Sequence, residues 1–481
     1  MQHVACPGCG AQVEFHSPAS VMAVCEYCRT TVLKDADTVR DIGKMGSVLE
    51  DYSPLQIGSS GVYQGRNFNV IGRIQLRYPA GFWNEWFVLF DDGENAWLAD
   101  ASGQYTMTFE KPAPPGLPAF TALKPGQSLT LAGHIYTASD VREATCTGGQ
   151  GELPFKVGTG WQARVADFRY MAQFVTIDYS DDVAKIFIGQ AVTLSEIKAQ
   201  ALRDTDAITD TSGRVKGKIG SLNCPHCGSP VQFTPGATTA LICPSCHSSV
   251  DVSGPTAEVL EVGSRLAAIP LTLELGAVGN IDGINYTVLG ALKRSSTDAT
   301  AHWTEYLLYE AQRGFLWLIE SNEGWERATV EDVWPVWDQP DSITLDQRRF
   351  AKTDDYGARV DAAIGAFNWR VAVGDTVRVV EFSGGDQQLA GEMSESELTW
   401  SRARRVPLDQ VRAWFGEHVH VELSPHPTHV KTAKAFLILL AIVNVVPVLF
   451  GGGLALAIAL FTAGFIFLPA VMLDAMDARN A

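Results

Sequence analysis

The sequence predicts a mainly β protein in which a cysteine-rich unit and a small β-sandwich or barrel occur twice in tandem, followed by an apolar helical hairpin. Three observations support this prediction. Eight of the nine cysteines form two sets of identical spacing, and the chain aligns with itself at an offset of 218 residues. In addition, residues 435–473 form a run of 39 residues without a charged side chain.

The two cysteine sets both read C-x2-C-x15-C-x2-C, a spacing typical of zinc ribbons. Four thiolates on two short loops can surround one zinc ion tetrahedrally, and a site closed by four protein ligands is structural rather than catalytic. We therefore predict two structural zinc ions in a reducing compartment, with disulfides as the less favoured alternative. The leftover Cys146 is interpreted as a buried thiol. The predicted zinc ligands are Cys6, Cys9, Cys25 and Cys28 in the first set and Cys224, Cys227, Cys243 and Cys246 in the second.

The self-alignment continues well beyond the cysteines. Residues 57–72 fall on residues 275–290 with four matching glycines. Trp83 then falls on Trp303 at an offset of 220, and Gly160 falls on Gly374 at an offset of 214. Small changes of offset are what loop insertions and deletions produce, so the chain contains a tandem duplication.

Each repeated module has the composition of a β domain. Short runs such as 68–71 and 86–90 are rich in β-branched and aromatic residues, and Gly, Pro, Asp and Asn separate such runs at regular intervals. This pattern predicts a sandwich or a small barrel rather than a parallel sheet with crossover helices. Between the two copies we expect a helix at residues 193–202 followed by a polar linker.

Glu85 and Glu305 are the same acid in the same tryptophan-flanked strand of the two copies. Strand alternation places Glu85 on one face with Trp83. A carboxylate on such a face is either paired or has a raised pKa. Three interpretations stay open: a structural carboxylate bonded to a backbone group or to an arginine such as Arg164 or Arg378, a ligand contact, or a general acid-base catalyst.

The uncharged run near the C-terminus is too long for one membrane span and suits two, because one helical span needs about 20 residues. Three glycines at 451–453 divide the run. Whether the first half crosses fully or is re-entrant stays open, and a buried soluble hairpin is the alternative. Lys431, Lys434 and Arg479 flank the run, which predicts that both of its ends are cytoplasmic.

The predicted organisation has seven parts. They are a zinc ribbon at 1–34, a β module at 45–190, a helix and linker at 191–222, a second ribbon at 223–252, a second β module at 262–408, a juxtamembrane tether at 409–432, and a transmembrane hairpin at 433–474.

The charge balance argues against nucleic acid as a partner. The formal net charge is -17, whereas a protein that binds phosphate backbones needs a basic surface. The second ribbon, residues 224–250, contains no Lys or Arg.

The glycine-rich stretch at 57–72, the Trp-Asn-Glu-Trp motif at 83–86 and residues 151–155, with their partners in the second copy, resemble the uncharacterised bacterial family catalogued as domain of unknown function 4178. The resemblance covers residues 57–189 and 275–405. It implies no activity, but it implies a bacterial protein, and for such a protein the tail predicts a multi-pass protein of the inner membrane in a membrane-stress context. The second copy departs from the first at Ala366, where the first has Glu152.

These observations lead to two hypotheses about function. The first is a membrane-anchored, cytoplasm-facing scaffold whose β modules bind a protein partner, because no catalytic constellation stands out. The alternative is an enzyme or a small-molecule sensor that uses Glu85 and Glu305. A deep polar pocket around these acids would favour the alternative, whereas arginine-paired or solvent-facing carboxylates would favour the scaffold.

Overall fold

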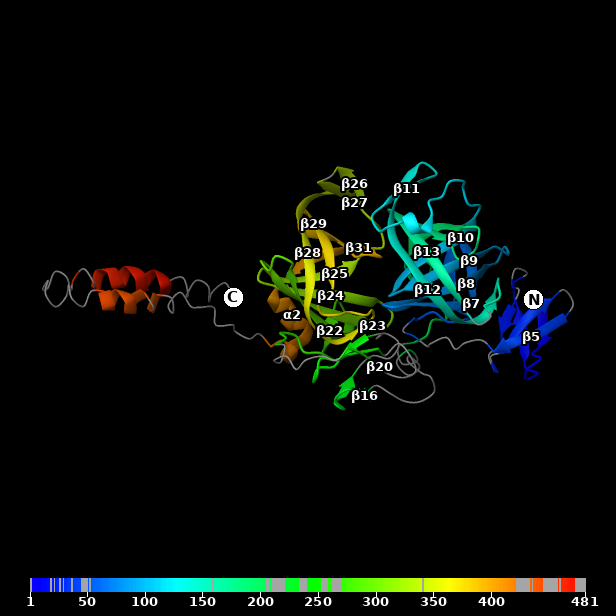
Figure 1. Ribbon diagram of the computed structural model, residues 1–481, viewed down its shortest axis with the longest axis horizontal. Coiled ribbons are helices and arrows are strands. Elements are labelled where there is room, and N and C mark those ends of the chain that lie inside the picture. The colour runs from blue at the N-terminus through cyan, green and yellow to red at the C-terminus, as the bar shows by residue number, and fades with distance from the viewer. Residues whose placement is uncertain are drawn as a thin grey trace. The chain divides into compact units, whose positions relative to one another are not determined.

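The computed structural model divides the chain into two compact units, residues 1–419 and 420–481, each described by itself (Figure 1). The structure describes residues 2–471 with gaps at 18–19, 21, 26, 29, 36–37, 45–50, 52, 158–159, 205–207, 209–220, 233–239, 252–257, 262–269, 340, 421–432, 435, 444–456 and 458–459.

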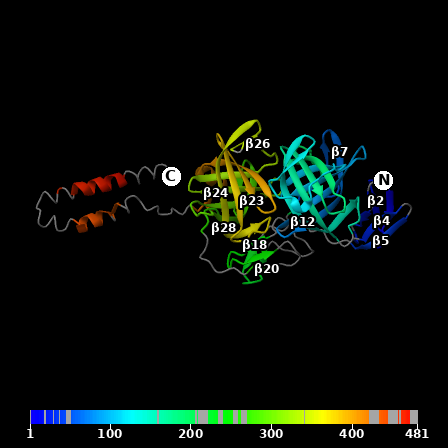
Figure 2. The ribbon, with the colours of Figure 1, turned by 45° about the horizontal axis from the view of Figure 1, so that its top comes forward.

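Each of the two β modules is a closed antiparallel barrel of eight strands (Figures 1 and 2). The first barrel runs in the order β7 (Arg66–Tyr78), β8 (Gly81–Phe90), β9 (Asn95–Ala101), β10 (Gln104–Lys111), β15 (Lys185–Val192), β14 (Gln173–Asp178), β13 (Trp161–Tyr170) and β12 (His134–Leu153), and β12 closes on β7. The second runs in the order β22 (Ile284–Ser296), β23 (His302–Glu310), β24 (Gly314–Ser321), β25 (Gly324–Val330), β31 (Leu398–Val406), β30 (Gln387–Met393), β29 (Thr376–Gly384) and β28 (Arg348–Phe367), and β28 closes on β22.

The two barrels share one strand order, which confirms the tandem duplication. Trp83 lies opposite Leu76 in the β7–β8 ladder, and Trp303 lies opposite Arg294 in the β22–β23 ladder. Short accessory elements flank the barrels: β6 (Ser60–Tyr63), β11 (Ser128–Leu131) and the 3-10 helix η1 (Phe120–Ala122) in the first copy, and β21 (Val278–Ile281), β26 (Val336–Gln339) and β27 (Ser342–Leu345) in the second.

A pair of glycines closes each barrel. Gly72 of β7 faces Gly151 of β12, and Gly290 of β22 faces Gly365 of β28. A Cβ atom on Gly72 would lie 1.7 Å from the carbonyl oxygen of Glu152, and Gly151 has a φ of +64° that side chains disfavour. The backbones of the two closing strands therefore approach so closely at these positions that there is no room for a side chain.

The cysteine-rich units are small sheets joined to the barrels by strand pairing. Val24 of β3 pairs with Gly151 of β12, and Ile242 of β18 pairs with Gly365 of β28. Each unit thus adds strands alongside the end of the long strand that closes its barrel. Their strands are β1 (Gln2–Ala5), β2 (Gln12–Phe15), β3 (Met22–Val24), β4 (Thr30–Asp35) and β5 (Thr38–Lys44) in the first, and β16 (Ser221–Asn223), β17 (Pro230–Gln232), β18 (Ala240–Ile242), β19 (Ser249–Asp251) and β20 (Glu258–Glu261) in the second.

The segment after each barrel packs on the barrel's outer face. The helix predicted at residues 193–202 is wrong: these residues form capped turns, in which the Thr193 N–H donates to Glu196 and the chain reverses at Lys198 with a φ of +47°. Ile197 is nevertheless buried in the outer core, because packing rather than helix propensity determines this segment.

In the second copy the corresponding segment is the helix α2 (Leu408–Phe415), followed by the 3-10 helix η2 (Gly416–His418). The prediction of an extended tether from residue 409 is therefore wrong for its first ten residues. Val411 and Phe415 lie one helical turn apart and are buried in the core of the second barrel. The rest of the predicted tether, 421–432, lies outside the described residues.

The C-terminal unit does not bear out the predicted membrane hairpin at 433–474. No helix in the described part of the chain combines sufficient length and apolar character to cross a membrane. The predicted multi-pass inner-membrane location and its orientation are therefore wrong. The predicted glycine break at 451–453 lies outside the described residues.

We predict that Gly72→Ala lowers the free energy of unfolding by more than about 3 kcal/mol, because the new methyl group has no room beside the Glu152 carbonyl. Gly93→Ala is the matched control, since Gly93 has a φ of +86° and an added Cβ would meet no atom within 4 Å. That control should cost only the backbone strain of about 1 kcal/mol. Denaturant unfolding of both variants tests this, and equal effects would contradict the role of the glycine pair.

Candidate functional site

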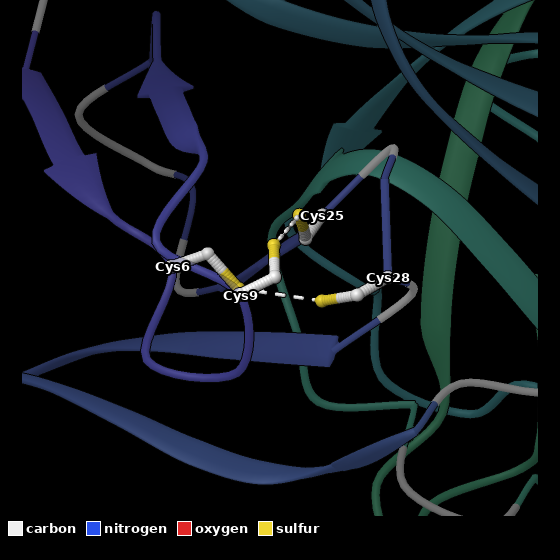
Figure 3. A group of neighbouring side chains, drawn as sticks. All are labelled: Cys6, Cys9, Cys25 and Cys28. Carbon is white, nitrogen blue, oxygen red and sulfur yellow. Dashed lines mark hydrogen bonds between the residues drawn. The ribbon is translucent and has the colours of Figure 1, made fainter.

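The predicted metal ligands come together in both cysteine-rich units. Figure 3 shows the first of the two clusters. The four sulfur atoms of each set lie within 4.8 Å of one another. The Cys6–Cys28 and Cys9–Cys25 sulfur atoms are 3.5 and 3.7 Å apart. In the second unit the Cys224–Cys246 and Cys227–Cys243 distances are both 3.7 Å. Each cluster can hold one metal ion, while Cys146 is buried in the core of the first barrel, as predicted.

The first barrel encloses a polar lumen made of two cavities of about 180 and 110 Å³. The inward faces of all eight strands contribute to their walls. The two cavities meet at five residues that line both, namely Trp83, Glu85, Thr108, Val165 and Thr176. Glu85 therefore lies between the two cavities of the lumen.

The carboxylate of Glu85 has an unusual environment. It accepts a hydrogen bond of 2.9 Å from the Trp83 indole N–H, and within the described residues no Lys, Arg or His side chain pairs with it. Burial raises the pKa of Glu85 to about 8, and the nearby carboxylates of Asp167 and Asp178 add to the increase, while the Trp83 hydrogen bond opposes it. Glu85 is therefore largely protonated at neutral pH.

The larger cavity contains both acids and bases. The guanidinium of Arg142 forms ion pairs with Asp140 and with Glu397, the second at 3.1 Å, and stacks 4.1 Å from the ring centroid of Tyr78. Asp167 accepts a hydrogen bond of 2.7 Å from Thr176, and burial raises the pKa of Asp167. Glu397 belongs to the second copy, so the second barrel helps to cover this end of the lumen.

The smaller cavity, at the end nearer the cysteine-rich unit, is aromatic and acidic. Glu85 and Asp178 contribute carboxylates, and no Lys, Arg or His lines it among the described residues. Trp97 and Phe155 stack with their ring centroids 5.8 Å apart, and Phe155 meets Trp161 edge-on at 5.3 Å. The aromatic lining residues are Trp83, Trp97, Phe155, Trp161 and Phe187.

The equivalent acid of the second barrel is neutralised within the protein. Glu305 accepts hydrogen bonds from Arg294 at 2.9 Å and from the Trp303 indole at 2.6 Å. Arg294 also pairs with Glu392 at 3.3 Å. Arg294 occupies the ladder position that Leu76 holds in the first barrel. At this position the second barrel therefore has a cation that pairs with the acid, and the first barrel has a neutral side chain.

The predicted arginine partners are wrong. Arg164 directly precedes Val165, which lines the lumen, so strand alternation turns Arg164 outward. Arg378 pairs with Asp355 at 2.8 Å instead of with Glu305.

The sequence alone did not indicate five further charged residues of the lumen. On β13, strand alternation from Val165 would have indicated two of them. The five are Asp140, Arg142, Asp167, Arg169 and Glu397.

Glu152, the acid without a counterpart in the second copy, joins the first cysteine-rich unit to its barrel. Its carboxylate accepts hydrogen bonds from the His16 N–H at 2.5 Å, the Ser17 N–H at 3.0 Å and the Ser20 hydroxyl at 2.6 Å. Glu152 is only 2% exposed. Its role is thus structural, and it lies outside the lumen.

The family model described as "Domain of unknown function (DUF4178)" matches residues 56–194 and 274–408, which together are more than half of the chain. These two regions span the two barrels and end where the segments that follow the barrels begin. No curated protein matches the chain.

We predict that Glu85→Gln makes the protein more stable than the wild type at high pH. Because the pKa of Glu85 is raised when folded, the folded protein holds a proton that the unfolded chain releases, and stability is lost as pH rises from about 4.5 to about 8. Glutamine mimics the protonated acid. Its advantage in unfolding free energy should therefore grow by about 2 kcal/mol between pH 6 and pH 9.

Denaturant unfolding at both pH values measures this difference. Glu323→Gln serves as the control, because Glu323 is an exposed acid of the second barrel paired with Arg405. The control should change the unfolding free energy by less than about 0.5 kcal/mol at either pH. If the two variants show the same pH dependence, the interpretation of Glu85 as a protonated lumen acid is wrong.

Proposed function

The chain belongs to the DUF4178 family, and from this premise and the geometry of its first barrel we propose that the protein binds a small molecule in that lumen. The observation that carries the proposal is the contrast between the two copies: Glu85 faces a cavity, whereas Glu305 is closed off by Arg294. An enclosed cavity with apolar walls and a few convergent polar groups is the usual form of a ligand site.

The second barrel takes a supporting role in this proposal. Its Arg294 pairs with Glu305 and Glu392, at the positions that correspond to Leu76, Glu85 and Asp178 of the first barrel. The second barrel also contributes Trp334, Glu397 and Thr399 to one end of the first lumen, where the Val141 N–H donates to the Ser396 carbonyl at 2.9 Å. In this proposal the second barrel covers one end of the ligand site in the first barrel. Binding of a protein partner, the scaffold hypothesis, stays a prediction.

We further propose zinc as the metal of both cysteine clusters. Zinc–sulfur bonds of about 2.3 Å in a tetrahedron place the sulfur atoms about 3.8 Å apart. The observed distances of 3.5–3.7 Å fit this requirement. The ions would act structurally, because four protein ligands leave no position for a substrate.

The ligand proposal predicts that filling the lumen abolishes binding. Val165→Trp places an indole between the two cavities, whereas Val183→Trp adds the same group at a position that is 75% exposed. Ligand-observed NMR with 1-hexanol, hexylammonium and hexanoate should detect binding of at least one probe to the wild type and the Val183 variant, and none to the Val165 variant. Thermal unfolding checks that both variants are folded. If the probes bind equally well to the two variants, they bind outside the lumen and the proposal is wrong.

The zinc proposal predicts about two zinc ions per chain by elemental analysis. Cys25→Ser and Cys243→Ser should each lower the content by one ion, because three thiolates hold zinc less tightly than four. Cys146→Ser is the control and should keep both ions, because Cys146 lies outside the clusters. A content unchanged by the cluster variants, or a different metal, would contradict the proposal.

A further inference from the structure

We propose that the ligand of the first barrel is a small organic cation, a protonated amine or a quaternary ammonium with an apolar body, held between Glu85 and Asp178. This inference rests on the proposed lumen binding and adds the chemical class of the ligand. It is carried by a comparison of the two barrels, position by position, at the aromatic end of the lumen.

The second barrel shows where a cation fits in this fold. The Arg294 guanidinium lies 2.9 Å from Glu305, 3.3 Å from Glu392 and 5.7 Å from the ring centroid of Trp303. Two carboxylates and an aromatic face thus surround one positive charge. Arg294 is 6% exposed, so its charge is held inside the barrel.

The first barrel keeps every part of this arrangement except the cation. Glu85 corresponds to Glu305, and Trp83 to Trp303. Asp178 lies opposite Val165 in β13–β14 as Glu392 lies opposite Val379 in β29–β30, so these two acids also correspond. In place of the arginine stands Leu76, which is shorter and neutral and lines the smaller cavity.

The electrostatics of the cavity favour a positive ligand. Among the described residues, the smaller cavity is lined by two acidic side chains and by no basic one, and the charge of Asp178 is part of the cause of the raised pKa of Glu85. A cation between them would offset that charge and stabilise the ionised form of Glu85. An anion would be repelled by Asp178 and would disfavour the ionised form of Glu85 still further.

The walls add a preference for an ammonium with apolar substituents. The faces and edges of Trp83, Trp97 and Trp161 enclose the cavity together with Phe155 and Phe187. Aromatic faces attract ammonium groups and bury alkyl chains. A metal ion suits this cavity poorly, because hard cations need several oxygen ligands.

The test compares three probes with the same six-carbon chain and different charge: hexylammonium, 1-hexanol and hexanoate. Titration calorimetry or ligand-observed NMR on the full chain at pH 8 measures their affinities. We expect hexylammonium to bind at least ten-fold more tightly than 1-hexanol, and hexanoate to bind more weakly than both.

Variants at Leu76 and Glu85 show where the preference arises. Leu76→Arg supplies the internal cation of the second barrel and should abolish hexylammonium binding, while Leu76→Met keeps a neutral side chain and should keep the preference. Glu85→Gln removes one carboxylate and should reduce the preference for hexylammonium over 1-hexanol to less than three-fold.

Three outcomes would overturn the inference. If 1-hexanol or hexanoate binds as tightly as hexylammonium, the cation class is wrong, although lumen binding stands. If the Leu76→Arg variant is folded and still binds hexylammonium, the cation does not occupy the position inferred from Arg294. If none of the three probes binds at tens of millimolar, the proposed lumen binding fails, and this inference fails with it.

Discussion

The close backbone contact between Gly72 and Gly151, repeated between Gly290 and Gly365, is the constraint on which the rest of the structure depends. An eight-stranded sheet has two edges until its first and last strands meet, and only closure creates a lumen. The contact lies where β12 leaves its partner β13 and pairs with β7 and then β3. One short stretch of chain therefore closes the barrel and carries the cysteine-rich unit.

The two copies of the barrel bury an equivalent acid in different electrostatic environments. Glu305 is paired with an internal arginine, whereas Glu85 is not. In the second barrel Arg294 offsets the cost of burying Glu305 and also pairs with Glu392, which is partly exposed. In the first barrel Leu76 leaves Glu85 without an internal base, so the acid retains its proton near neutral pH. A buried charge that lacks a partner is costly for stability, and such sites are where function concentrates.

The cysteine-rich units are attached to their barrels differently in the two copies, because only the first copy has a buried acid at this junction. The first unit presents two backbone N–H groups and a hydroxyl to its barrel, and Glu152 accepts all three. Buried donors of this kind need an acceptor, since an unpaired one costs about 1–3 kcal/mol. In the second copy Ala366 makes the equivalent strand pairing through its backbone, opposite Leu241 of β18.

The sequence by itself determined the features that depend on local spacing. The cysteine intervals identified both four-thiol clusters, the self-alignment identified the duplication, and strand alternation placed Glu85 and Trp83 on one face. Local propensity failed where packing or length decides: residues 193–202 form turns, and the start of the predicted tether forms α2. The uncharged tail suggested membrane spans, but no helix among the described residues is long and apolar enough to cross a membrane.

Only the tertiary structure decided that the face shared by Glu85 and Trp83 lines a lumen, and which other side chains lie there. Barrel closure brings Glu85, Asp167 and Asp178 together from strands about 80 to 90 residues apart, and the register of β22 against β23 places Arg294 beside Glu305. A single sequence does not contain this information, because residue spacing constrains neighbours along the chain. The pairing of distant strands depends instead on the free energy of the whole folded barrel.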